Sequence, residues 1–380
     1  MKKKTISLML GTVLFCACQP GQEKTTVSGT LQDVANDTLF VMYTPVNQRS
    51  QLKVDTLVAQ SGQFTYDVAC DSIPLELAIY HSGAPETEEG EMNSQINLLV
   101  FPGENITLTG SMKDHQVEGS TFFTAFSEAE KAWKAAEEQI TEMYVKAMQM
   151  QKDSIPYDSI MRFYAPAQEI FQQIQDAKKT FVNEHLDSDV SLYLLANLGM
   201  DNIRELLPKL ADKVKNGPLA ALYQSLDNML AKEQAREEAK KAITEGAPAP
   251  DFTLKDINGK DLALSSLRGK YVVLDFWGSW CGWCIKGIPD MKKYYDKYKN
   301  KMEILGIDCN DTEEKWKEAV KEHDIPWLHV RNESGKNDVS ILYAIEGYPT
   351  KIVVDPEGKI AKVVVGEDPA FYEYLDGLFK

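Results

Sequence analysis

Three patterns of hydrophobic and polar residues follow one another along the chain. Between residues 27 and 118, short stretches such as "TLFVMYTP", "GQFTYDV" and "NITLTGSM" alternate hydrophobic and polar positions and are separated by turn residues. A two-residue period is typical of strands that bury one face. This part is therefore predicted to be an all-β, sandwich-like domain.

The next part, residues 119–244, has the spacing of amphipathic helices. It includes "FSEAEKAWKAAEEQITEMYVKAMQMQK" and "LAALYQSLDNMLAKEQAREEAKKAI". Ser127, followed three residues later by Glu130, matches a helix-start signal, so the first long helix is expected to begin at Ser127. We predict a helical segment that ends at the linker "EGAPAPDF", residues 245–252.

Strands and helices alternate in the last part, residues 245–380. "YVVLDFW" is a continuous apolar stretch, as expected for a strand buried on both faces, and helical spacing follows it. "MEILGID", "TKIVVD" and "KIAKVVVG" are predicted to be further strands, with helices at 312–323 and 369–379. This order predicts an α/β domain whose central sheet is flanked by helices.

The first residues have the pattern of a targeting segment. Basic "MKKK" precedes apolar "TISLMLGTVLF", which is too short to span a membrane as a mature helix, and "FCACQPGQ" follows. Small residues before a cysteine resemble a bacterial lipoprotein signal. Residues 1–17 are therefore expected to be a signal peptide, Cys18 the lipidated N-terminus and residues 18–26 a tether. An ordinary secretory signal is the alternative.

Composition narrows the function further. The net charge of −16 argues against nucleic-acid binding, because phosphate contacts need a basic surface. Apart from the signal and the lipidated Cys18, the cysteines are Cys70, Cys281, Cys284 and Cys309, which are too few for a disulfide framework in a chain of this length. Secretion would place them in an oxidising compartment.

Cys281 and Cys284 stand at the predicted start of a helix, after the buried strand. Free backbone N–H groups and the helix dipole favour a thiolate at Cys281, which is expected to be the exposed cysteine that attacks a substrate disulfide. Cys284 could then resolve the mixed disulfide. A zinc site and a purely structural disulfide are the alternatives. Zinc is disfavoured because there is one Cys-x-x-Cys and no histidine pair at ligand spacing near it, so no metal and no cofactor beyond the redox-active disulfide are expected.

Several motifs in order carry a family resemblance. "VVLDFWGSWCGWC" resembles the active-site strand and turn of thioredoxins, and "GYPT", residues 347–350, resembles the loop that faces it. The preceding "APAPDFTLKDINGKDLALSSLRGK" is similar to the TlpA-type branch, which overlaps in sequence with the peroxiredoxins. The resemblance covers residues 245–380 and implies a thioredoxin-like fold. The β-rich and helical region before it resembles an uncharacterised region often fused to TlpA-type lipoproteins.

The resemblance also implies roles for single residues. Asp275 matches a buried acid that helps to move the proton of the second thiol, with a plain charge at a strand end as the alternative. Pro349 would follow a cis peptide bond, and Tyr348 would offer backbone groups to an extended substrate. Trp280, Trp283, Tyr348 and Pro349 are the expected substrate-binding residues.

Two residues depart from the family's habit. Trp283 stands where relatives often carry proline, and it either contacts a partner or covers the disulfide. Gly287 stands where TlpA-type relatives often carry glutamate, so acid–base control from that position cannot be carried over. Cys309, at the exit of the next strand, is either a bystander thiol or a third redox group.

The sequence therefore predicts a lipid-anchored thiol-disulfide oxidoreductase of the bacterial cell envelope, facing the periplasm and reducing protein disulfides. Its expected partners are protein disulfides or dithiols, an unidentified electron donor, the membrane and, through the N-terminal domains, a second copy of the chain. The alternatives are a thiol peroxidase, a binding or scaffold lipoprotein with an idle thioredoxin-like domain, and a disulfide-forming oxidant. Peroxiredoxins place threonine three residues before the attacking cysteine, where this chain has Gly278.

Overall fold

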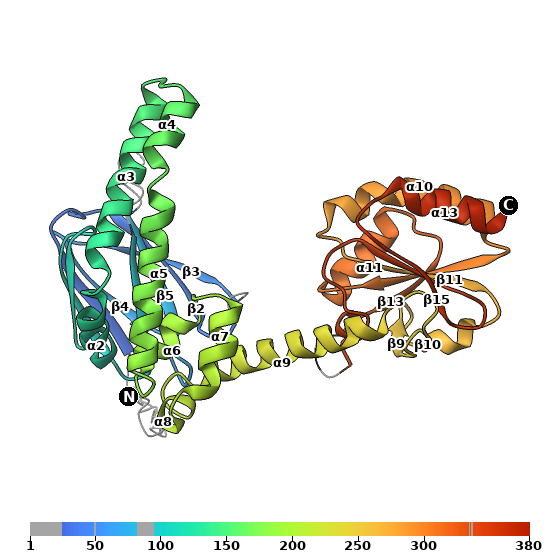
Figure 1. Cartoon of the computed structure of the whole chain (residues 1–380). Helices are drawn as coiled ribbons and strands as arrows, with labels where there is room; N and C mark the ends of the chain where they lie inside the picture. Colours follow the sequence, from blue (N-terminus) through green and yellow to red (C-terminus); the bar gives the residue numbers. More distant parts are fainter. Residues whose placement is uncertain (1–24, 49–50, 82–94, 334, 336) are drawn as a thin grey trace, which may run out of the picture. The chain divides into compact units, whose positions relative to one another are not determined.

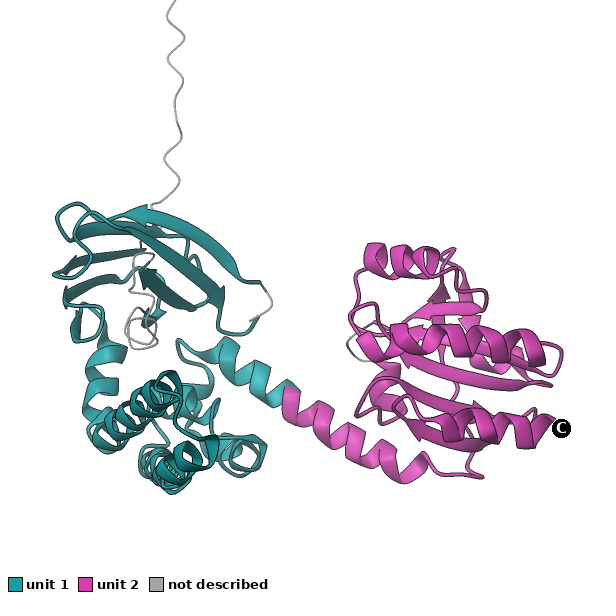
Figure 2. Cartoon of the chain, turned by 90° about the horizontal axis from the view of Figure 1, so that it is seen from above, with its two compact units in different colours: residues 1–228 teal, residues 229–380 magenta. Residues whose placement is uncertain are grey.

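The computed structural model describes residues 25–48, 51–81, 95–333, 335 and 337–380. The chain divides into two compact units, 1–228 and 229–380, coloured separately in Figure 2. The boundary falls inside helix α9 (Ala220–Ala242). The predicted signal peptide, Cys18 and most of the predicted tether lie outside the described residues. None of the helices described is both long enough and apolar enough to span a membrane.

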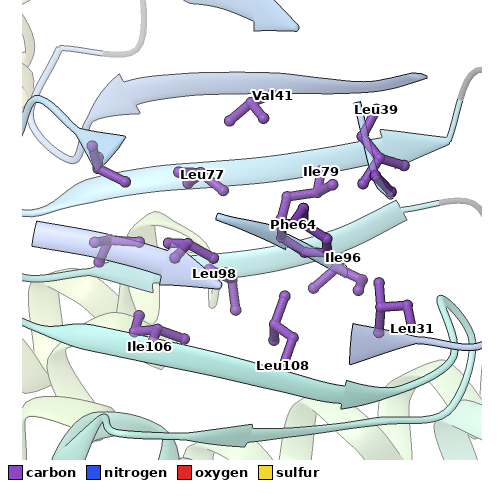
Figure 3. Close-up of a cluster of buried hydrophobic side chains, with 14 of the residues drawn as sticks. Leu31, Leu39, Val41, Phe64, Leu77, Ile79, Ile96, Leu98, Ile106 and Leu108 are labelled. Atoms are coloured by element: carbon purple, nitrogen blue, oxygen red, sulfur yellow. The ribbon is translucent and has the colours of Figure 1, made fainter. Parts of the chain in front are cut away.

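Two four-stranded sheets form the first part of unit 1, with strand orders β4-β1-β7-β8 and β3-β2-β5-β6. The strands are β1 (Thr25–Leu31), β2 (Thr38–Pro45), β3 (Lys53–Val58), β4 (Gln63–Val68), β5 (Leu75–His81), β6 (Gln95–Val100), β7 (Asn105–Gly110) and β8 (His115–Glu118). Side chains from both sheets, among them Leu31, Leu39 and Ile106, share one buried core (Figure 3). The predicted β-rich N-terminal region is present, and its alternating residues fill this core.

Helices make up the rest of unit 1. They are α2 (Thr121–Glu130), α3 (Lys134–Lys152), α4 (Tyr157–Tyr164), α5 (Ala167–Glu184), α6 (Asp189–Leu195), α7 (Met200–Leu206), the 3₁₀ turn η1 (Leu207–Lys209), α8 (Asp212–Lys215) and the start of α9. The helical segment predicted after the strands is therefore present.

The predicted helix start at Ser127 is wrong. Helix α2 begins at Thr121, and Ser120 caps it by accepting a hydrogen bond from the Phe123 N–H. Ser127 lies inside α2, where its hydroxyl donates to the Thr124 carbonyl 3.1 Å away. The chain leaves β8 through Gly119, whose φ of 83° lies in the left-handed region that glycine adopts easily. The helix therefore begins directly after Ser120, which can cap its free N–H groups.

A seven-stranded sheet, in the order β10-β9-β13-β12-β11-β14-β15, organises unit 2. Its elements along the chain are β9 (Thr253–Asp256), β10 (Asp261–Ala263), the 3₁₀ turn η2 (Leu264–Leu267), β11 (Tyr271–Trp277), α10 (Gly282–Tyr298), β12 (Met302–Asp308), α11 (Glu313–Glu322), β13 (Leu328–Arg331), α12 (Val339–Leu342), β14 (Thr350–Val354), β15 (Ile360–Val365) and α13 (Pro369–Phe379). The central strand β11 is parallel to β12 and antiparallel to β14.

Successive side chains of β11 enter two different cores. Leu274 and Phe276 pack with residues of α12 and of the segment before β9. Val273 and Trp277 pack with residues of α10, α11 and α13. Helices α10 and α13 lie side by side over that face of the sheet (Figure 1), where the Tyr294 hydroxyl is 3.2 Å from an Asp376 carboxylate oxygen. The predicted α/β unit with a sheet covered on both faces is confirmed.

Candidate active site

Cys281 and Cys284 form a disulfide at the N-terminus of α10. Cys281 is the N-cap of the helix, and its Sγ accepts a hydrogen bond from the Cys284 N–H at 3.1 Å. After reduction, the same N–H and the helix dipole would stabilise a thiolate on Cys281. The expected exposure of Cys281 is wrong for the disulfide form, since both cysteines are only 6% exposed.

Trp280, the residue before Cys281, contacts Cys309 and Tyr348. Its Nε1 donates a hydrogen bond to the Cys309 carbonyl at 2.9 Å, and its ring meets the Tyr348 ring edge-on at 5.2 Å. A Cβ at Gly278 would overlap the Trp280 indole and lie 2.9 Å from the Cys309 carbonyl oxygen. The position of Trp280 therefore depends on glycine at 278.

Trp283 lies between the two cysteines in sequence and is 62% exposed. The Lys286 ammonium lies 4.7 Å from the centre of its ring. A ring this open to solvent favours a contact surface over a cover for the disulfide. Pro349 follows a cis peptide bond from Tyr348, as the sequence resemblance implies, and burial raises the pKa of the Tyr348 hydroxyl.

Asp275 lies buried on β11, on the same face as Val273 and Trp277, which pack with both cysteines. Burial raises the pKa of Asp275 to about 6, against the opposing effect of Lys351 and with a further increase from Glu367. Asp275 is thus placed between the sheet and the helix that carries the disulfide.

Sequence reasoning missed Lys351 and Glu367. Lys351 stands directly opposite Asp275 on β14, and its Nζ is 2.7 Å from Glu367 Oε2. The Tyr372 hydroxyl donates to Glu367 Oε1 at 2.6 Å. A lysine inside the apolar stretch "TKIVV", next to Pro349, was a visible signal, because buried lysines need a partner. Glu367 gave no signal in the sequence, since no local motif indicates that it meets Lys351 and Gly287 in the folded domain.

Asp311 supports the turn before Cys281, and the buried Asp308 lies near it. Asp311 accepts hydrogen bonds from the Ser279 N–H and hydroxyl, both at 2.7 Å. Burial, followed by the nearby Asp311, raises the pKa of Asp308 to about 9, so Asp308 is protonated at neutral pH. Burial lowers the pKa of His329 to about 3, so this ring is neutral beside Trp277. Sequence reasoning did not single out this group.

Cys309 belongs to the core on the opposite face of the sheet from the disulfide. It is 1% exposed, and burial raises the pKa of its thiol to about 12. A neutral, enclosed thiol is a poor nucleophile, which favours the bystander interpretation. Within the described ranges, no three His, Cys, Asp or Glu side chains gather closely enough to hold a metal ion.

Comparisons with known proteins place this unit among disulfide-exchanging proteins. Residues 246–363 match the AhpC/TSA family. Thiol-disulfide oxidoreductase ResA of Bacillus cereus is 37% identical over 133 residues, 35% of this chain and 75% of that protein. Its namesake in Bacillus subtilis is 36% identical over 140 residues, 36% of this chain and 77% of that protein. The crystallised thioredoxin domain of a Bacteroides vulgatus thiol-disulfide oxidoreductase is 34% identical, with a TM-score of 0.34, and the match covers 36% of this chain and 99% of that domain.

Proposed function

We propose that this chain, which belongs to the thioredoxin-like thiol-disulfide oxidoreductases, reduces disulfide bonds in proteins of the bacterial cell envelope. Disulfide exchange is the activity of the family. The observation that carries the assignment to particular residues is the Cys281–Cys284 disulfide at the start of α10, with Cys281 as the N-cap. Reduction is proposed as the direction because the TlpA-type proteins that the sequence resembles mostly reduce.

In the proposed reaction, the Cys281 thiolate of the reduced enzyme attacks one sulfur of a substrate disulfide. The substrate S–S bond breaks, one substrate sulfur leaves as a thiolate that takes up a proton, and a mixed disulfide with Cys281 forms. Cys284 then loses its proton and attacks Cys281 Sγ, which releases the second substrate thiol. Two electrons pass to the substrate, and the enzyme is left with its disulfide.

Asp275 is the proposed acceptor for the Cys284 proton. It lies on the sheet face that packs with the cysteines, and it is buried. With its pKa raised to about 6, Asp275 is mostly ionised at neutral pH, yet it binds a proton more readily than an ordinary carboxylate. These properties suit a group that must take up and return a proton in each cycle.

Trp280, Trp283, Tyr348 and Pro349 are the proposed contacts with a protein substrate. Trp280 and Trp283 expose large aromatic surfaces on the two sides of Cys281 in sequence, at 51% and 62%. Aromatic residues that are exposed in the free protein often anchor interfaces. The edge-on contact between Trp280 and Tyr348 joins this surface to the loop with the cis bond.

The peroxidase alternative lacks support from the site. A threonine at position 278 would need space that the Trp280 ring and the Cys309 carbonyl occupy. The threonine that peroxiredoxins place there is therefore absent here, and the local packing disfavours it. Formation of a sulfenic acid on Cys281 at low peroxide concentration would reverse this conclusion.

The envelope location, the lipid anchor on Cys18 and the TlpA subtype belong to the proposal. They are supported by the pattern of the first 18 residues and by the motifs of residues 245–380. Labelling with a radioactive fatty acid in a bacterial host should mark the wild-type chain and not Cys18→Ser. Docking or dimerisation through the N-terminal unit stays a prediction.

The central experiment traps substrates. Cys284→Ser should accumulate mixed disulfides on Cys281, which non-reducing gels and mass spectrometry would identify. The double variant Cys281→Ser/Cys284→Ser is the matched control and should trap nothing. If Cys284→Ser traps no protein although Cys281 still reacts with iodoacetamide, and the wild type does not reduce insulin with a dithiol donor, the proposed function is wrong.

A further inference from the structure

Gly287 leaves a space on the helix that carries the disulfide. It lies three residues, or about one turn, after Cys284 on α10 and is buried. A Cβ at this position would overlap the carboxylate of Glu367. Glu367 belongs to the connection between β15 and α13, far from Gly287 in sequence. The absence of a side chain on α10 therefore makes room for an acid that comes from another element.

The Glu367 carboxylate is held in this space by two partners. Its Oε2 pairs with Lys351 Nζ at 2.7 Å, and its Oε1 accepts from the Tyr372 hydroxyl at 2.6 Å. The Lys351 side chain is only 2% exposed and that of Glu367 16%, so water screens the pair weakly. Burial and Glu367 both raise the pKa of Tyr372, which keeps its hydroxyl protonated and able to donate.

Lys351 also faces Asp275. The two residues are directly opposite on β14 and β11, and side chains at opposite positions of antiparallel strands lie on the same face of the sheet. A single buried ammonium therefore serves two carboxylates, Asp275 beside the disulfide helix and Glu367 above Gly287. The two nearby charges act on Asp275 in opposite directions: the Lys351 ammonium lowers its pKa and the Glu367 carboxylate raises it.

We propose that Glu367 is a positioning residue of the thiol-disulfide centre, which together with Lys351 sets the proton affinity of Asp275 and replaces the acid missing from position 287. This inference rests on the proposed function, in which Asp275 accepts the Cys284 proton. By opposing the charge of Lys351, with which it pairs, Glu367 keeps Asp275 from being locked in its ionised form. Asp275 can then release and take up a proton near neutral pH.

The other charged or titratable groups around Asp275 do not provide this control. On β12, the residue opposite Asp275 is Gly306, and the His329 ring lies against it. The pKa of His329 is lowered to about 3 by burial, so it is neutral at working pH. Asp290 on α10 raises the pKa of Tyr372, which stays a neutral hydroxyl. Among the residues that the structure describes, Lys351 and Glu367 are thus the charges that act on Asp275.

The test follows the titration of Asp275 by carbon NMR of its carboxyl group in the oxidised full chain. Glu367→Gln should lower the midpoint by about one pH unit, because Lys351 then acts on Asp275 alone. Lys351→Met should raise the midpoint by a similar amount, because the opposing charge is lost. Glu245→Gln, which removes an exposed partner of Lys362 on β15, is the matched control and should leave the midpoint unchanged.

A rescue experiment tests whether a carboxylate in the space over Gly287 has the same effect whichever element supplies it. In the Glu367→Ala background, adding Gly287→Glu should restore the wild-type midpoint, because it returns a carboxylate to the same place from α10. Adding Gly287→Gln in the same background should not restore it. The inference would be overturned if Glu367→Gln and Lys351→Met moved the Asp275 midpoint in the same direction. It would also be overturned if Gly287→Glu and Gly287→Gln had the same effect on that midpoint.

The proposed function and the role of Glu367 can be refuted independently. If the wild type reduces no disulfide, the proposed function is wrong, while the NMR titration still decides whether Glu367 and Lys351 control Asp275. If the wild type is active but no variant moves the Asp275 midpoint, the role of Glu367 is wrong and the proposed function stands. If the proposed function and the role of Glu367 are both correct, the midpoint of the pH–rate profile for disulfide reduction should move in each variant together with the titration midpoint of Asp275.

Discussion

Asp275 and Lys351 stand directly opposite each other on the antiparallel strands β11 and β14, and both side chains are buried. This arrangement does not make Asp275 an ordinary ion-paired acid. Burial raises its pKa more than Lys351 lowers it, and Lys351 is also paired with Glu367. The domain therefore keeps beside its disulfide a carboxyl group whose charged form is disfavoured by burial, and this has consequences for stability and reactivity.

The first prediction concerns stability against pH. The pKa of Asp275 rises from 3.8 to about 6 on folding, so the folded state binds this proton more tightly than the unfolded state. The corresponding stability is present below pH 4 and is lost as the pH rises through 6, a change of about 3 kcal/mol. We compare the free energy of unfolding of Asp275→Asn with that of the wild type. The variant's value minus the wild-type value should be about 3 kcal/mol larger at pH 7 than at pH 4.

Urea unfolding of the oxidised proteins at the two pH values, followed by tryptophan fluorescence, measures this difference. Asp261→Asn is the control, because Asp261 is exposed on β10 and pairs with Lys255 at the surface. An Asp275→Asn protein that loses stability equally at both pH values would contradict the prediction.

The second prediction concerns the thiols. In the reduced protein at pH 7, Cys281 should react with iodoacetamide at least about tenfold faster than Cys309, because the start of α10 favours a thiolate. Cys309 should react only after unfolding in urea, since its thiol is enclosed and its pKa is raised to about 12. Peptide mass spectrometry after timed alkylation distinguishes the sites, and Cys309→Ala should leave the rate of disulfide reduction unchanged.

The third prediction concerns substrate binding by Trp283. Because its ring is mostly exposed, Trp283→Ala should change the free energy of unfolding by no more than about 0.5 kcal/mol. It should raise KM for a protein disulfide about tenfold, as expected for the loss of an aromatic anchor worth about 1.4 kcal/mol. The rate with a small aromatic disulfide should stay within about twofold. Equal losses for both substrates would point instead to an effect on the disulfide itself.

The fourth prediction concerns Gly278. Gly278→Thr should destabilise the folded protein by about 1–3 kcal/mol, because its side chain meets the Trp280 ring and the Cys309 carbonyl. It should not produce peroxidase activity. The double variant Gly278→Thr/Trp280→Ala should lose less free energy of unfolding than the two single variants lose together. A double-mutant cycle from urea unfolding measures this difference. Simple additivity would contradict the contact.

Much of the fold could be predicted from local patterns. The alternation in "NITLTGSM" places Ile106 and Leu108 in the shared core of the two N-terminal sheets. The stretch of β11, which is apolar except for Asp275, indicates its burial on both faces. The first helix start could not be placed correctly, because the Ser127–Glu130 spacing fits a capping box, whereas the cap in the structure is Ser120, whose place is set by the end of β8.

By itself, the sequence determined where the candidate redox site lies: Cys281 and Cys284 with their spacing, and, through the family resemblance, Asp275 in the buried strand and Pro349 in the facing loop are all visible in short motifs. Only the tertiary structure brought Lys351 and Glu367 to Asp275 and seated Glu367 over Gly287. The reason is physical. A motif reports local geometry, whereas the proton affinity of a buried acid depends on desolvation and on charges that distant segments bring within a few ångströms.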